Sequence, residues 1–119
     1  MKSLSTNYAR GMIAEIYAAL YLSFKGYRIC RWRYKTPVGE VDLIARKRKT
    51  TVFVEVKLRP TAEDGLHAIT PVMRSRISRA ASHYLSSGSR GMAQEYRFDV
   101  IVITGFRVYH LDNAWFNPT

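Results

Sequence analysis

Large apolar residues recur every three or four positions within residues 8–25, and this spacing predicts a helix there. Because the segment is apolar on nearly every side, we expect the helix to be buried on more than one side. Its one acid, Glu15, shares a face with Ala19 and Leu22, so its carboxylate does not lie on an obviously solvated stripe. The large apolar positions are Ile13, Ile16, Tyr17, Leu20 and Phe24.

The rest of the pattern predicts strands on both sides of a second helix. Residues 41–45 and 51–58 are apolar runs joined by a basic turn, which predicts an antiparallel hairpin. The stretch 60–70 contains proline and glycine and is expected to be a loop. The order helix, three strands, helix, one or two strands predicts one mixed α/β domain over residues 1–119. The other predicted elements are strands at 27–35, 96–104 and 108–111 and a helix at 71–85.

The chain is strongly basic, and most of the excess charge lies in its first half. Nineteen lysines and arginines face nine acids, which gives a net charge of +10. Thirteen of the bases are arginine, whose planar side chain matches phosphate. A polyanion is therefore the expected partner, with nucleic acid first and an acidic membrane surface second. Residues 1–60 contain only four acids, which therefore stand in a strongly positive segment. They are Glu15, Glu40, Asp42 and Glu55.

Several classes of protein are disfavoured by the composition. A single cysteine, Cys30, excludes an internal disulfide framework and a cysteine-based zinc site, and it fits a reducing compartment. The three histidines lie far apart and lack the spacing of metal ligands. The longest apolar stretch, 12–24, is too short to span a bilayer, and no leader peptide is recognisable. We expect a soluble, cytoplasmic protein that does not enter a membrane.

Alternation along the predicted strands brings chemically active residues onto shared faces. Glu55 and Lys57 point to one side of their strand, and the hairpin allows Asp42 to meet Glu55. Carboxylates that gather in a partly buried place repel one another and lose hydration, and Mg²⁺ or Mn²⁺ relieves both costs. Lys57 beside such an ion can orient a water or stabilise charge during phosphodiester hydrolysis. Glu15 can supply a further ligand.

Simpler interpretations of these residues stay open. A Glu55-x-Lys57 pair is often a surface ion pair, Asp42 could cap a turn, and Glu15 could pair with a nearby base such as Arg10. Apolar residues flank each acid, which solvated ion pairs do not require. On the residues alone, a metal-dependent site and ordinary ion pairs are about equally well supported.

Bases elsewhere in the chain are candidates for phosphate contacts. The run 46–49 is interpreted either as a phosphate clamp beside the site or as a solvated turn. Bases and aromatic residues alternate in 31–35, which fits neutralisation of a nucleic-acid backbone with stacking, although Trp32 and Tyr34 could equally pack in the core. The candidate nucleic-acid-binding residues are Arg31, Arg33, Lys35, Arg46, Lys47, Arg48, Lys49, Arg59, Arg74 and Arg76.

Motifs along essentially the whole chain resemble the YraN family of small bacterial proteins. They include Glu15 in an alanine-rich helix, the sequence GEVDLIA at 39–45, VFVEVKLR at 52–59 and RFDV at 97–100. The combination of GE-x-D with VFVEVK is the specific part of the resemblance. It implies a restriction-endonuclease-like fold, with a central mixed sheet flanked by helices, similar to archaeal Holliday-junction resolvases of the PD-(D/E)xK nuclease superfamily.

The resemblance also implies roles for individual residues. By position, Asp42 and Glu55 are the metal-binding acids, Lys57 is the catalytic lysine and Glu15 matches the acid of the first helix. In many relatives a lysine stands near the start of the second helix, where this chain has Met73. The neighbouring Arg74 or Arg76 is then expected to act as the phosphate contact.

These observations lead to two main expectations. The first is a Mg²⁺-dependent endonuclease that acts on DNA, including branched or junction DNA, and forms a homodimer by analogy with the resolvases. The second is a nucleic-acid-binding module on a nuclease scaffold with little or no catalysis. A third interpretation is a structural subunit whose basic face docks an acidic partner.

Overall fold

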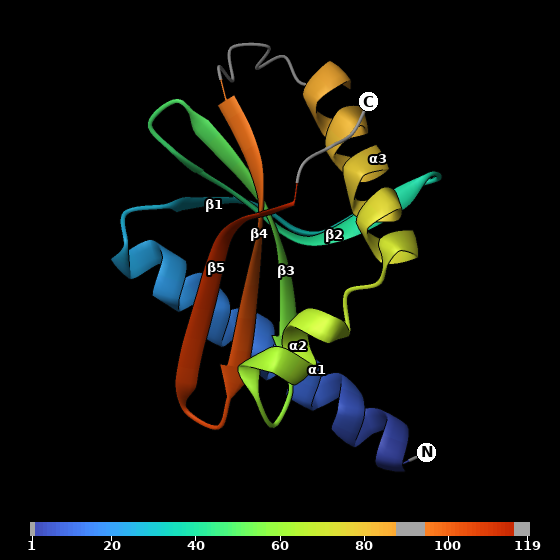
Figure 1. Ribbon diagram of the computed structural model, residues 1–119, viewed down its shortest axis with the longest axis vertical. Coiled ribbons are helices and arrows are strands. Elements are labelled where there is room, and N and C mark those ends of the chain that lie inside the picture. The colour runs from blue at the N-terminus through green and yellow to red at the C-terminus, as the bar shows by residue number, and fades with distance from the viewer. Residues whose placement is uncertain (1, 88–94, 116–119) are drawn as a thin grey trace.

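The computed structural model describes residues 2–87 and 95–115 (Figure 1). Within them, one five-stranded sheet has the order β1-β2-β3-β4-β5. All neighbouring strands are antiparallel except β3 and β4, which are parallel. The prediction of a central mixed sheet flanked by helices is confirmed, and the arrangement is compatible with a restriction-endonuclease-like fold. The elements are α1 (Lys2–Phe24), β1 (Arg28–Thr36), β2 (Gly39–Lys47), β3 (Thr50–Leu58), α2 (Ala62–His67), α3 (Pro71–Ser87), β4 (Glu95–Thr104) and β5 (Arg107–Trp115).

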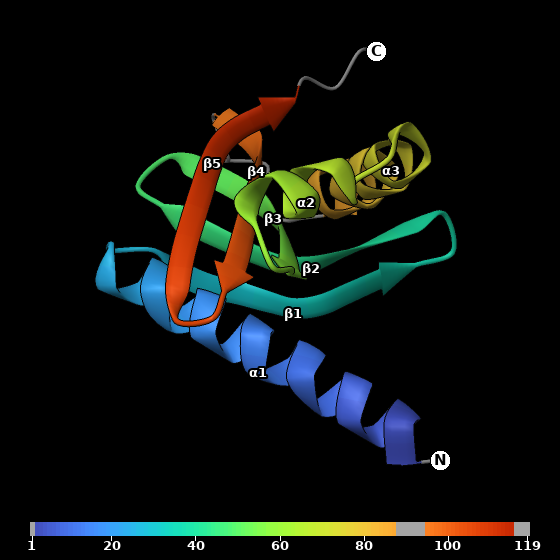
Figure 2. The same ribbon diagram turned by 60° about the horizontal axis from the view of Figure 1, so that its bottom comes forward.

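Helices α1 and α3 cover opposite faces of the sheet, as Figure 2 shows. Successive residues of a strand point to opposite faces. Val54 of β3 accordingly belongs to the core cluster that contains Leu22 of α1. Its neighbour Phe53 belongs to the cluster that contains Ile77 of α3. β3 is therefore buried on both faces, which explains its nearly continuous apolar sequence.

Helix α1 is buried on one side only, which corrects the expectation that it is covered on several. Its inner face consists of alanines and Leu22, which allow a close approach to the sheet. Most of the large apolar residues that define the predicted helix point outward instead, and Ile13, Leu20 and Phe24 are 63%, 54% and 90% exposed. The apolar pattern thus identifies the helix correctly but not which of its sides the sheet covers.

Helix α2 occupies part of the stretch that the sequence predicts to be a loop. The Thr61 hydroxyl caps it by accepting the backbone N–H of Asp64 at 3.0 Å, and acidic residues in the first turn favour this end of the helix. Gly65 allows the helix to lie close to β4, because a Cβ at that position would collide with the methyl groups of Val102. The helix therefore depends on packing against the sheet, which the turn-like composition does not reveal.

A second glycine sets the position of α3. A Cβ on Gly39, at the start of β2, would collide with the backbone carbonyl of Arg76 in α3. The helix can lie this close to β2 only because the strand begins with glycine. In the described parts of the chain, no helix is both long enough and apolar enough to cross a membrane.

Candidate active site

The candidate site lies at a fork between β2 and β3. Their antiparallel pairing ends at Leu43 and Val54, whereas β3 remains paired with β4 as far as Leu58. Beyond the fork, the backbone N–H of Val56 donates to Asp42 Oδ2 at 2.9 Å. A side chain thus takes the place of a strand partner, and the bond fixes the Asp42 carboxylate between the two strands.

Asp42 and Glu55 form a coupled pair of carboxyl groups within this fork. Glu55 is only 7% exposed, and the two side chains are joined by a hydrogen bond. Burial raises the pKa of Asp42 to about 6, and the charge of Glu15 contributes to the rise. Burial, followed by the charge of Asp42, raises the pKa of Glu55 to about 8. The pair therefore resists holding two negative charges at neutral pH unless a cation is present.

Lys57 supplies one positive charge to this pair. Its Nζ lies 3.6 Å from Glu55 Oε2, and both side chains are largely buried. The two residues lie on the same side of β3, as strand alternation predicts. A single ammonium group facing two carboxylates leaves the site with a net deficit of positive charge when both acids are ionised.

A pocket of about 430 Å³ opens onto these three side chains. Helix α1 forms one wall, where the small residues Gly11 and Ala14 leave room beside Glu15. Arg10 also lines the pocket, whereas its sequence position suggests only an ion pair with Glu15. Gly11, one helical turn before Glu15, was the available sequence signal for this wall. The full lining is Arg10, Gly11, Ala14, Glu15, Asp42, Glu55, Val56, Lys57, Leu58 and Arg59.

Glu15 reaches the pocket wall but is engaged by an arginine. Arg33 Nε donates to Glu15 Oε1 at 2.9 Å, and this bond raises the pKa of Arg33. Arg33 also donates to the Tyr8 hydroxyl and has a left-handed backbone with φ of 48°. Within residues 2–87 and 95–115, no three acidic, histidine or cysteine side chains are placed to form a metal-binding cluster. The structure thus brings Glu15 near Asp42 and Glu55 without joining the three acids.

The Asp42–Glu55 pair fits Mg²⁺ or Mn²⁺ by its donor chemistry. Carboxylate oxygens are hard ligands, and Mg²⁺ usually retains several waters, so one or two carboxylates can hold it. The raised pKa values of both acids mark a place where a divalent ion relieves repulsion and lost hydration. Asp42 and Glu55 are therefore the residues that would hold such an ion.

The predicted nucleic-acid-binding bases are spread over the molecule, and Arg59 is the one that lines the pocket. The turn at 46–49 lies at the other end of the β2–β3 hairpin, roughly 16 Å from Asp42 along β2 at about 3.3 Å per residue. The turn therefore does not line the pocket, and its role as a phosphate contact stays a prediction. Arg76 lies 4.0 Å from Glu40 in an exposed ion pair. The exposed bases of the set are Arg31, Lys35, Lys47, Arg48, Lys49, Arg59, Arg74 and Arg76.

Met73 occupies an apolar environment. It packs against the cluster formed by Ile69, Val100 and Val102, and it is absent from the pocket lining. A methionine suits this contact because its flexible side chain fills irregular gaps. Arg74, the next residue on α3, is exposed and retains the role of a possible phosphate contact.

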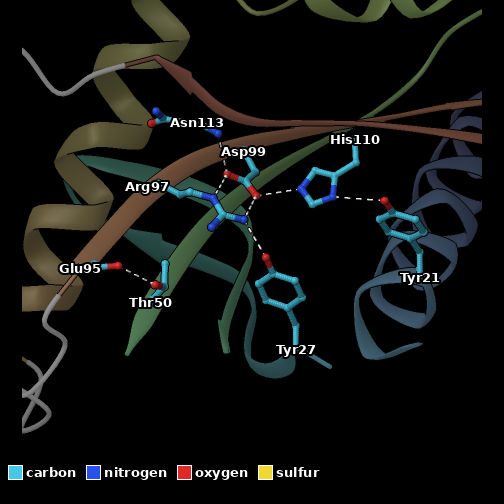
Figure 3. Close-up of polar contacts among 8 residues, drawn as sticks. All are labelled: Tyr21, Tyr27, Thr50, Glu95, Arg97, Asp99, His110 and Asn113. Atoms are coloured by element: carbon cyan, nitrogen blue, oxygen red, sulfur yellow. Dashed lines mark hydrogen bonds and ion pairs between the residues drawn. The ribbon is translucent and has the colours of Figure 1, made fainter. Parts of the chain in front are cut away.

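A second buried polar cluster surrounds Asp99 on β4 (Figure 3). Its side chain is fully buried and accepts two hydrogen bonds from Arg97, at 2.9 and 3.1 Å, and one from the Asn113 backbone. His110 Nε2 lies 2.8 Å from Asp99, and its Nδ1 faces the Tyr21 hydroxyl of α1. Burial acts to raise the pKa of Asp99, but the bonds from His110 and Arg97 outweigh it and lower the pKa. The cluster ties β4, β5 and α1 together, and the RFDV motif was a sequence signal for it.

Comparison with known proteins places this architecture in a family. Residues 14–103 match the model of the uncharacterised protein family UPF0102. The chain is similar to a UPF0102 protein of Caulobacter vibrioides (strain NA1000 / CB15N), with 44% identity over 108 residues that cover 88% of this chain and 85% of the relative. It is also similar to one of Rhodopseudomonas palustris (strain HaA2), with 42% identity over 106 residues that cover 88% and 83%. The resemblance found in its motifs is confirmed, and the chain belongs to the uncharacterised family UPF0102, the YraN family.

Proposed function

We propose that this protein is a Mg²⁺-dependent endonuclease that hydrolyses phosphodiester bonds in DNA, including branched or junction DNA. One observation carries the proposal, namely the coupled, largely buried pair of Asp42 and Glu55 with Lys57 Nζ 3.6 Å from Glu55. The pair lies in a pocket of a chain with a net charge of +10. The long-range charge favours a polyanionic substrate, while the local acids favour a divalent cation.

Each charged residue of the pocket has a separate role in the proposed hydrolysis. Asp42 and Glu55 would hold the metal ion, which, when bound, polarises the phosphodiester and lowers the pKa of a bound water. The Lys57 ammonium orients the attacking water and stabilises the negative charge that develops on the phosphoryl oxygens. Arg10 and Arg59 at the pocket wall bind phosphates on either side of the cleaved bond.

The first test is cleavage of labelled linear and four-way-junction DNA with Mg²⁺ or Mn²⁺. We expect cleavage by the wild type and a loss of about 100-fold or more in Asp42→Asn and Lys57→Ala. Glu40→Gln is the matched control, because Glu40 is an exposed acid two residues from Asp42 on the same strand. Cleavage that persists in Asp42→Asn and Lys57→Ala would come from a contaminant and would refute the assignment.

The second candidate function is a nucleic-acid-binding module without turnover. The ion pair between Arg33 and Glu15 favours it, because this pair leaves two acids rather than three available to a metal. This function predicts salt-dependent DNA binding that is unchanged in Asp42→Asn, together with no cleavage of any substrate. Fluorescence anisotropy at several salt concentrations measures the binding, and the cleavage assay separates the two functions. No DNA binding even at low salt would refute both.

A further inference from the structure

The outer face of α1 carries a stripe of exposed apolar side chains. Ile13, Ile16, Leu20 and Phe24 are 63%, 47%, 54% and 90% exposed. They recur every three or four residues, so they lie along one side of the helix. The buried alanines and Leu22 occupy the opposite side. An outward-facing helix side is ordinarily polar, whereas a helix that is apolar on both sides is packed between two layers.

Phe106 extends this stripe beyond the helix. It lies in the turn between β4 and β5 and is 91% exposed. The Tyr17 hydroxyl donates to the Phe106 backbone carbonyl at 2.8 Å, which fastens the turn to α1. The stripe is therefore defined as Ile13, Ile16, Leu20, Phe24 and Phe106, five exposed apolar side chains on α1 and on the turn that is hydrogen-bonded to it.

We propose that this stripe is the interface through which two copies of the chain form a symmetric dimer. Each copy has a net charge of +10, so two copies repel each other least where they meet through surfaces without charge. Within residues 11–24 the sole Asp, Glu, Lys or Arg is Glu15, which faces the pocket on the other side of the helix. A nucleic acid or an acidic protein requires a charged surface and does not fit this stripe.

The size of the stripe also fits a second copy. Its five side chains expose on the order of 700 Å² of mainly apolar surface, given that a large aromatic side chain buries about 150–250 Å². Stable interfaces bury roughly 800 Å² per partner. Monomeric proteins rarely leave such a patch exposed unless it functions in binding.

The arrangement of the stripe allows a two-fold interface. Two α1 helices packed antiparallel bring Ile13 of one copy to Phe24 of the other, with Ile16 and Leu20 near the axis. The contact is self-complementary, as a two-fold interface requires. It covers the second side of α1, where the apolar pattern of the sequence predicts burial. The dimer depends on the stripe alone and does not require that the proposed nuclease function be correct.

Light scattering coupled to size-exclusion chromatography tests the dimer, at protein concentrations from about 1 µM to about 1 mM. We expect a dimer mass for the wild type and a monomer mass for Ile16→Glu and Leu20→Glu. Val72→Glu is the matched control, because Val72 is a 68% exposed apolar residue on α3, outside the stripe, and this variant stays dimeric. A monomeric wild type over the whole range, or stripe variants that remain dimeric, would overturn the proposal.

A covalent test confirms that the variants report on contact rather than on folding. In a Cys30→Ser background, Leu20→Cys places a thiol near the proposed two-fold axis. We expect mild oxidation to produce a disulfide-linked dimer of this variant but not of Val72→Cys in the same background. Equal cross-linking of the two variants, or none in Leu20→Cys, contradicts the interface.

Discussion

Replacing Glu55 by glutamine removes one of two buried carboxyl groups while keeping the size and hydrogen-bonding capacity of the side chain. In the metal-free protein the pKa of Glu55 is about 8 against an ordinary value of 4.5, chiefly because of burial and then because of the Asp42 charge. Between these pH values the folded protein retains a proton that the unfolded chain has released. The free energy of unfolding of the wild type therefore falls as pH rises from 5 to 8.

The size of this fall follows from the same shift. One retained proton over about 3 pH units corresponds to roughly 4 kcal/mol, at about 1.4 kcal/mol per unit. Because Asp42 and Glu55 titrate as a coupled pair, the fall belongs to the pair rather than to Glu55 alone, and we expect Glu55→Gln to remove roughly 2 kcal/mol of it. Glu55→Gln should match the wild type in stability at pH 5 and exceed it by about 2 kcal/mol at pH 8.

Urea denaturation followed by circular dichroism, in the presence of EDTA, measures these differences at pH 5, 6, 7 and 8. Glu40→Gln provides the control, because it removes an exposed acid and should follow the wild-type profile. Adding Mg²⁺ at pH 8 should then stabilise the wild type, by about 2.7 kcal/mol at a concentration 100 times its Kd, and stabilise Glu55→Gln much less.

Two results would refute the reasoning. A wild-type profile that runs parallel to that of Glu55→Gln between pH 5 and pH 8 would mean that burial does not raise the pKa of Glu55. Equal stabilisation of the two proteins by Mg²⁺ would mean that Glu55 does not contribute to ion binding.

Three further substitutions test other parts of the structure. Asp99→Asn should lower the free energy of unfolding by about 3 kcal/mol at pH 7, because it removes the carboxylate that partners the partly buried Arg97 and the buried His110. The pKa of Asp99 is lowered in the folded protein, so this loss should shrink as the pH falls below about 4, and thermal melts at pH 7 and below pH 4 measure it. Gly39→Ala should destabilise the protein by about 2 kcal/mol in urea titrations, because its Cβ collides with the α3 backbone, and an unchanged midpoint would contradict that close contact. Arg33→Gln should tighten Mg²⁺ binding in titration calorimetry by roughly threefold to tenfold, because it releases Glu15, whereas weaker binding would show that Arg33 supports the site.

The central part of the candidate site follows from local rules that act along the chain. Glu55 and Lys57 are two residues apart in a β-branched run, so any strand there places them on the same side. The short basic turn makes this strand and the preceding one antiparallel neighbours, which brings Asp42 close to Glu55. Strand spacing and turn length are short-range properties, and for this reason the alternation predicts the arrangement.

Other features arise from contacts between distant segments. The sequence pairs Arg33 with no particular acid, and the folded chain brings it to Glu15, 18 residues away, by packing α1 against β1. Helix α2 forms in a turn-like stretch because Gly65 fits against Val102 of β4. Which residues form an ion pair, and which backbones pack closely, depends on which helices and strands become neighbours in the fold. The local sequence around each residue does not specify these neighbours.

Helix α1 separates the two kinds of information most clearly. The periodicity of its apolar residues predicts a helix, and the chemistry of these side chains shows which of them favour burial. Both properties depend only on the local sequence. The tertiary structure shows that the sheet covers the alanine side, where small side chains permit close packing, and leaves Ile13, Leu20 and Phe24 exposed. Hydrophobicity specifies that a surface favours burial, and only the packing of whole elements determines what covers it.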